Sequence, residues 1–262
     1  MELIQTYMER DFPVPSNFEE YAYVSQLVQA YGIRKAIEAQ RRSMLRCMGT
    51  LYWQLNDCWP VISWSSLDYY NRWKALHYAA KEAYKDVLIS FEENENDISV
   101  FVISDKLNDL PVKLHTKLLG FNGKAIREMN KENILKASSS QVYQKVSLKD
   151  ISKKDQFLVT TIYSGDSVIA ENLFYFVSPK NILLPEVNIK KEITEIPNGY
   201  RIKLMSDNLV KNLFLQINAE GHFSDNYFDL LPNQAKTTVF NTDTQVSDIS
   251  NKIDILYLNQ IE

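Results

Sequence analysis

Residues 72–104 read RWKALHYAAKEAYKDVLISFEENENDISVFVIS, and the spacing of apolar residues changes within this stretch. Up to Leu88 the segment is rich in Ala, Leu, Lys and Glu, and its larger apolar residues recur every three to four positions. This spacing predicts a helix over 72–88. The acidic run that follows is typical of a solvated turn, and the alternation from Asp97 predicts a strand over 97–104. The chain therefore changes from helical to β-rich near residue 88.

A second helical pattern precedes this one. Residues 17–48 place apolar side chains at helical spacing, and Asn17 followed by two glutamates is typical of a helix start. We expect one long helix, continuous or broken at Gly32, that ends at Gly49. The run TLYWQL (50–55) predicts a strand. A lone strand needs neighbours, so residues 1–88 are expected to be the end of a larger α/β unit whose exposed apolar surface favours self-association.

The rest of the chain predicts two antiparallel sandwiches. Short alternating runs separated by turn residues, without helical spacing between them, are typical of this architecture. The segment PKNILLP (179–185) resembles a linker, which divides the β-rich part into domains at 89–179 and 180–262. The expected strands cover residues 97–104, 111–121, 141–148, 156–164 and 170–178 in the first domain, and 186–196, 199–206, 212–217, 235–241 and 252–259 in the second.

Composition narrows the function classes. The 262 residues are 45% hydrophobic and 24% charged, with a formal net charge of -4, which argues against global disorder and against nucleic acid or an anionic membrane as partner. Cys47 and Cys58 are too few for a disulfide framework and lack metal-ligand spacing with the three histidines. No motif indicates a cofactor or a membrane span. The first residues lack the apolar core of a signal peptide, so the signal of an exported parent would lie outside this chain.

Three of the four tryptophans fall within GTLYWQLNDCWPVISWSS (49–66). Two interpretations are open. If the segment is a loop at the active face of a β/α barrel, its rings can stack on sugar faces while Gln, Asn and Asp bind hydroxyls. Alternatively, the tryptophans are large core residues and Asn56-Asp57 forms a turn or cap.

Two stretches resemble one enzyme family. LYWQLNDCWPVISWSSLDYYNRWKALHYAAK (51–81) is similar to the last strand, loop and helix of the catalytic barrel in family 2 glycoside hydrolases of the β-mannosidase branch. HFSDNYFDLLPNQ (222–234) resembles a motif in their last immunoglobulin-like domain. One departure is Asn71, where family members often carry Gly, and Asn tolerates the left-handed backbone almost as well. The resemblance implies a barrel fragment of helix, strand and helix followed by two immunoglobulin-like sandwiches.

The resemblance also implies one wall of a sugar pocket. Trp53 would form the hydrophobic platform beneath the terminal sugar. Asn56 and Asp57 would lie at the mouth of the pocket, where they bind hydroxyls or hold neighbouring side chains. Trp59 and Trp64 either line the site or pack the loop onto the barrel rim.

The remaining candidates are interpreted as scaffold. Trp73 is expected on the buried face of the second helix, and His77 beside it has no partner at metal spacing. His115 and His222 have no nucleophilic residue near them in the sequence with which they could form a catalytic pair. The aromatic residues of 222–234 fit packing in a sandwich core better than sugar binding.

Catalysis requires residues that this chain does not contain. Retaining glycosidases use two carboxylates, and in this family the acid/base is a Glu after an Asn and the nucleophile a Glu in a Ser-Glu-Phe/Tyr-Gly type sequence. The only Asn-Glu step is Asn94-Glu95, in the acidic turn. We therefore expect an inactive C-terminal fragment of an exo-β-mannosidase that cleaves terminal β-mannosides of oligosaccharides. An exo-β-glucosaminidase, a β-galactosidase and a non-catalytic carbohydrate-binding or interaction module are the alternatives.

Overall fold

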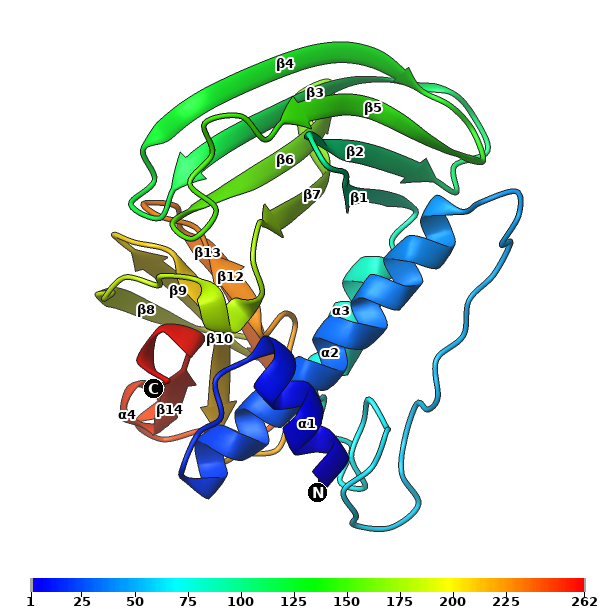
Figure 1. The fold of residues 1–262 in the computed structure, drawn as a ribbon. Helices are drawn as coiled ribbons and strands as arrows, with labels where there is room; N and C mark the ends of the chain where they lie inside the picture. Colours follow the sequence, from blue (N-terminus) through cyan, green and yellow to red (C-terminus); the bar gives the residue numbers. More distant parts are fainter. Residues whose placement is uncertain (1, 262) are drawn as a thin grey trace.

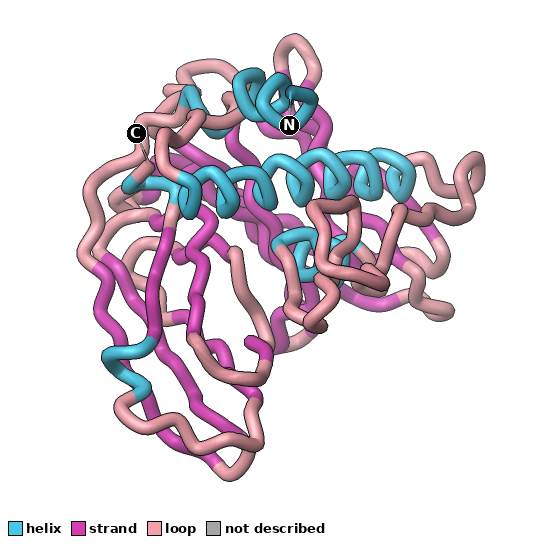
Figure 2. The backbone as a smooth tube through the Cα atoms, turned by 90° about the horizontal axis from the view of Figure 1, so that it is seen from below, coloured by secondary structure: helices cyan, strands magenta, loops and turns pink. Residues whose placement is uncertain are grey.

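The computed structural model describes residues 2–261, in which three helices and a long loop precede the strands (Figure 1). The helices are α1 (Glu2–Asp11), α2 (Phe18–Arg42) and α3 (Ala75–Ala83). Residues 43–74, called the aromatic loop below, leave the end of α2 and pass along one side of it before returning to α3 (Figure 1, Figure 2). None of the helices described is long and apolar enough to span a membrane.

Helix α2 starts as predicted but ends early. The Asn17 side chain accepts a hydrogen bond from the backbone N–H of Glu20 at 2.9 Å, which caps the helix. The helix continues through Gly32 without a break. It ends at Arg42 rather than at Gly49, because Leu45 adopts a φ of 78°, a left-handed conformation through which an α-helix does not continue.

The predicted strand over residues 50–55 is wrong. Within the aromatic loop the structure has only isolated bridges, between Asn56 and Leu67 and between Leu67 and Trp73. A strand is stable only beside a partner strand, and no strand of residues 2–261 pairs with this segment. The backbone turns back on itself instead, and the N–H of Ser66 donates to the carbonyl of Gln54 at 2.9 Å.

Helix α3 is shorter than predicted at both ends. Val87 and Leu88 belong to β1 (Val87–Glu93), in which five successive residues are buried. Because both faces of that segment are buried, it lacks the alternation that marks a strand in sequence. Trp73 lies before the helix and not on it, since α3 begins at Ala75. It is nevertheless half-buried and packs against the core that the helices share with the second sandwich.

The first sandwich confirms the predicted β-rich domain. Its two antiparallel sheets have the strand orders β1-β2-β5 and β4-β3-β6-β7. Besides β1, one more strand of this sandwich was not predicted: β4 carries charged residues along most of its length and lies at a sheet edge, where such side chains discourage pairing with other chains. The strands are β2 (Asp97–Ser104), β3 (Leu110–Gly120), β4 (Ala125–Leu135), β5 (Ser139–Ser147), β6 (Gln156–Ser164) and β7 (Ser167–Tyr175).

The second sandwich has the same layered plan, with the strand orders β11-β13-β9-β8 and β12-β10-β14. The two shortest strands, β11 and β12, were not predicted because two or three residues carry too little alternation to be seen. The elements are β8 (Ile189–Ile196), β9 (Gly199–Ser206), β10 (Val210–Ile217), β11 (His222–Phe223), β12 (Phe228–Leu230), β13 (Lys236–Asn241), α4 (Ile249–Lys252), β14 (Ile253–Leu256) and the 3-10 turns η1 (Pro179–Asn181) and η2 (Leu258–Gln260).

The helices cover the second sandwich rather than standing in solvent. One core joins them: from the helices Met8, Phe12, Val24, Leu27 and Tyr78, and from the sandwich Leu213, Phe228, Leu230 and Phe240 among others. The helices of the expected α/β unit are therefore covered within this chain, because the sandwich supplies the apolar face they need. Most of the large apolar side chains that are exposed in this region lie in the aromatic loop.

The two sandwiches meet across a third apolar core. It contains Phe157, fully buried, and Ile182 of the predicted linker, which is 9% exposed. At the same joint Gly123 has a φ of 81° and lies so close to Pro232 that an added Cβ would come within 2.9 Å of that ring. Only glycine fits such a turn without displacing its neighbour. The linker is thus part of a packed joint.

Candidate functional site

The aromatic loop presents its tryptophans to solvent. Trp53, Trp59 and Trp64 are 75%, 63% and 70% exposed. Leu51 and Ile62, also in the loop, are exposed as well. Large apolar side chains exposed in this number within one loop indicate a binding surface. These three tryptophans are therefore not core residues of the described structure, and their rings are accessible to a ligand.

Asp57 organises the loop from within. Its side chain is only 4% exposed, and one carboxylate oxygen accepts hydrogen bonds from the hydroxyls of Ser63 at 2.6 Å and Ser65 at 2.5 Å. Lys74 Nζ lies 3.8 Å from the same oxygen, and Gln54 Nε2 donates to the other oxygen at 3.4 Å. The hydrogen bonds from the two serines, assisted by Lys74, hold the pKa of Asp57 below its usual range.

Asn56 differs from its neighbour in sequence. It is exposed, and its backbone forms the parallel bridge to Leu67. Its side chain makes no hydrogen bond among the residues described, so its amide is available to a ligand. Asn56 and Asp57, predicted together at the mouth of a pocket, thus have different surroundings: the first faces solvent and the second holds the loop.

The loop offers no free carboxylate for an acid/base pair, because Asp68 is bonded to Arg72 at 2.6 Å and Asp57 to its own donors. The Asp57 carboxylate is ionised and engaged by its donors, so it cannot supply a proton at neutral pH. Asn94, before Glu95, donates hydrogen bonds to Asp97 at 3.0 Å and Ser99 at 3.1 Å within the acidic turn. Burial lowers the pKa of His77, whose Nδ1 lies 3.2 Å from Ser66 Oγ. Residues 2–261 contain no group of three or more His, Cys, Asp or Glu side chains that could hold a metal ion.

The motif at 222–234 packs as predicted. Its larger apolar residues are all buried: Phe223, Tyr227, Phe228, Leu230 and Leu231. Asn226 bonds both backbone groups of Leu215 at 2.8 Å, which fixes the turn before β12. The motif also reaches the helices, since Tyr78 of α3 donates to the carbonyl of Phe223 and Tyr227 donates to Gln26 of α2.

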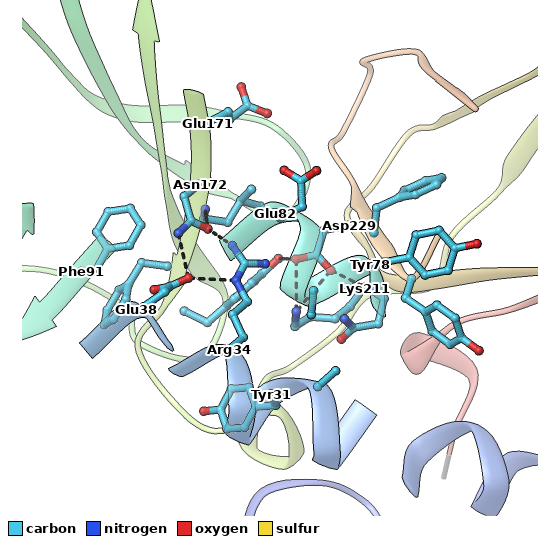
Figure 3. A pocket seen from close by; sticks show the side chains of 18 of the residues that line it. Tyr31, Arg34, Glu38, Tyr78, Glu82, Phe91, Glu171, Asn172, Lys211 and Asp229 are labelled. Atoms are coloured by element: carbon cyan, nitrogen blue, oxygen red, sulfur yellow. Dashed lines mark hydrogen bonds and ion pairs between the residues drawn. The ribbon is translucent and has the colours of Figure 1, made fainter. Parts of the chain in front are cut away.

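A cleft of about 1030 Å³ lies where the helices and both sandwiches meet. Figure 3 shows Arg34 between Glu38 and Asn172 in this cleft, with Lys211 beside Asp229. Arg34 bonds Glu38 and Asn172, both at 2.8 Å, and Lys211 lies 3.1 Å from Asp229. The sequence did not predict the cleft, because the segments that line it, in α2, β7 and the second sandwich, are far apart in the chain. Most of its charged groups pair with one another, as expected for a joint between domains.

The chain matches two domain families and several named proteins. Residues 96–181 match the Mannosidase Ig/CBM-like domain, and residues 184–261 match the Ig-fold domain Ig_mannosidase. Beta-mannosidase A of Aspergillus oryzae is 25% identical over 272 residues, covering 92% of this chain and 30% of the relative. Beta-mannosidase of Capra hircus is 27% identical, with 89% and 29% covered. The chain thus spans about a third of the length of these relatives.

Solved structures agree with the sequence matches. The crystal structure of β-D-mannosidase from Dictyoglomus thermophilum is 26% identical with a TM-score of 0.89, covering 98% of this chain and 32% of that one. An exo-chitosanase from Amycolatopsis orientalis, at 16% identity and a TM-score of 0.74 over 99% of this chain and 36% of its own, shares the fold. The domain matches and the similarity along nearly the whole chain identify it as a C-terminal piece of a family 2 glycoside hydrolase of the β-mannosidase type.

Proposed function

We propose that this chain is part of a retaining exo-β-mannosidase that releases terminal β-linked mannose from oligosaccharides. Residues 1–88 would be the end of its catalytic barrel, followed by sandwiches at 89–179 and 180–262. The exposed rings of the aromatic loop carry the proposal, because an accessible indole provides a flat apolar face for a sugar ring. Trp53 is proposed as the platform, with Asn56 as hydroxyl ligand and Trp59 and Trp64 beside it.

The chain alone is proposed to be inactive. Hydrolysis with retention needs two carboxylates about 5–5.5 Å apart, one of them protonated. Of the two carboxylates within the aromatic loop, Asp57 is ionised and bonded to its neighbours, and Asp68 accepts hydrogen bonds from Arg72 and from the backbone of its own turn. Both glutamates would come from other parts of the full-length enzyme. Turnover of an aryl β-mannoside by this chain, lost on Trp53→Ala, would overturn this proposal.

Trp53→Ala in the full-length protein tests the sugar platform. We expect kcat/KM for an aryl β-mannoside to fall by roughly 10–100-fold, equivalent to about 1.4–2.7 kcal/mol of transition-state stabilisation. Ile62→Ala, equally exposed in the same loop, serves as the control and should retain full activity. Equal effects of the two variants would contradict the platform role.

The sugar specificity is tested with the same full-length protein. Aryl β-mannoside, β-glucosaminide and β-galactoside are compared by kcat/KM, and we expect the mannoside to be preferred. Preference for either other sugar would assign the protein to a related activity. If none is cleaved but this chain binds manno-oligosaccharides without Trp53, the sandwiches would be a carbohydrate-binding module instead.

A further inference from the structure

The start of α3 contacts both the aromatic loop and the second sandwich. On the loop side, Lys74 Nζ donates to Ser65 Oγ at 2.8 Å and approaches Asp57. On the sandwich side, the ring of Trp73 stacks on His222 with centroids 4.6 Å apart. Two consecutive residues therefore connect the loop to a sandwich residue more than 140 positions further along the chain.

Two contacts hold the backbone of this helix start: the N–H of Lys74 donates to the carbonyl of Ser66 at 3.0 Å, and a side-chain oxygen of α2 caps the helix itself. The N-cap residue Lys74 makes no side-chain capping bond, so the first backbone N–H groups of α3 need another acceptor. Gln26 of α2 provides it, because its Oε1 accepts from the N–H of Ala75 at 3.2 Å. The same oxygen accepts from the hydroxyl of Tyr227 at 3.0 Å. Tyr227 is itself fixed, since it is 9% exposed and stacked on Phe214 at 4.4 Å.

Asp57 continues the connection into the loop. Each of its partners lies next to a tryptophan in the sequence, so one carboxylate connects the segments that carry three of the four indoles. The pairs are Gln54 after Trp53, Ser63 and Ser65 on either side of Trp64, and Lys74 after Trp73.

We infer that the second sandwich positions the aromatic loop, with Tyr227, Gln26 and Asp57 as positioning residues. Tyr227 orients Gln26, Gln26 fixes the start of α3, and Lys74 at that start holds the ring of donors around Asp57. The value of this arrangement for sugar binding rests on the proposed function. The positioning itself does not, so it is tested without any sugar.

The test follows the four indole N–H resonances of this chain by 1H–15N NMR, assigned from single tryptophan replacements. Gln26→Leu removes the acceptor of both hydrogen bonds, and we expect the resonances of Trp73 and Trp64 to shift. Gln26→Glu keeps an oxygen at the same place and should retain the original positions. A residue that only stabilised the fold would not show this rescue.

Tyr227→Phe is the milder test and carries the inference if Gln26→Leu fails to fold. It removes only the hydroxyl, and its matched control is Tyr200→Phe, whose buried hydroxyl bonds Val246 within the same sandwich. We expect Tyr227→Phe, and not Tyr200→Phe, to shift the indole resonances. Combined with Asp57→Asn, its effect should be less than additive. Identical spectra for the two tyrosine variants would overturn the inference, whatever the activity of the full-length enzyme.

Discussion

The aromatic loop and the second sandwich are both rich in aromatic residues, but they are stabilised in opposite ways. Trp53 in the loop is 75% exposed, whereas Phe240 in the sandwich is 1% exposed. The sandwich is held by apolar packing. The loop is held by hydrogen bonds that converge on Asp57, which leaves its rings available. Aromatic content alone therefore does not separate a scaffold from a binding surface; the polar residues between the rings do.

The largest contrast in stability is expected between a ring of the joint and a ring of the loop. Phe157 is fully buried where the two sandwiches meet, so Phe157→Ala should lower the free energy of unfolding by about 3–5 kcal/mol. Trp59→Ala removes an exposed ring and should change it by no more than about 0.5 kcal/mol. Guanidinium unfolding followed by far-UV circular dichroism measures both. Similar losses would show that the loop is stabilised by packing after all.

The next effect concerns the buried ion pair beside the cleft. Burial would raise the pKa of Asp229, but Lys211, the N–H of Asn212 and the hydroxyl of Tyr175 outweigh it and hold the pKa below its ordinary value. Asp229→Asn leaves Lys211, whose side chain is 9% exposed, without its counter-charge. This change should lower the free energy of unfolding by about 3 kcal/mol.

The same pair makes stability depend on pH. Because the folded pKa of Asp229 lies below the unfolded one, its contribution is present above the unfolded value of about 3.9 and is lost as the pH falls through the folded pKa. As the pH falls through that acidic window, the free energy of unfolding should therefore decline more steeply for the natural chain than for Asp229→Asn. Parallel curves would contradict this assignment.

The sequence predicted the sandwiches well because their strands alternate and end at turn residues. The prediction missed β1, in which both faces of the strand are buried, and β4, in which charged residues hide the alternation. Trp53, Trp59 and Trp64 are neighbours in the sequence, but their exposure and the separate surroundings of Asn56 and Asp57 depend on how the loop folds. The partners of Asp57 could not be inferred, since backbone turns bring Ser63 and Lys74 to one carboxylate. Contacts such as Tyr227 with Gln26 join residues about 200 positions apart and leave no local pattern.

The smallest expected effect tests how locally the loop is held. Asn71 has a φ of 60°, and the turn around it is closed by Asp68, whose side chain accepts from the N–H groups of Tyr70 and Arg72 at 2.9 Å. Asn71→Ala removes the side-chain amide that lets Asn tolerate the left-handed region and should lower the free energy of unfolding by about 1 kcal/mol. Gly is common at this position in the family that the sequence resembles, and Asn71→Gly should leave the free energy of unfolding within a few tenths of a kcal/mol of the natural chain. Near-UV circular dichroism measures the environment of the tryptophans, and the free energy of unfolding measures the stability of the whole chain. If Asn71→Ala changed the near-UV spectrum but not the free energy of unfolding, the loop would be ordered by its own turns, independently of the sandwich core.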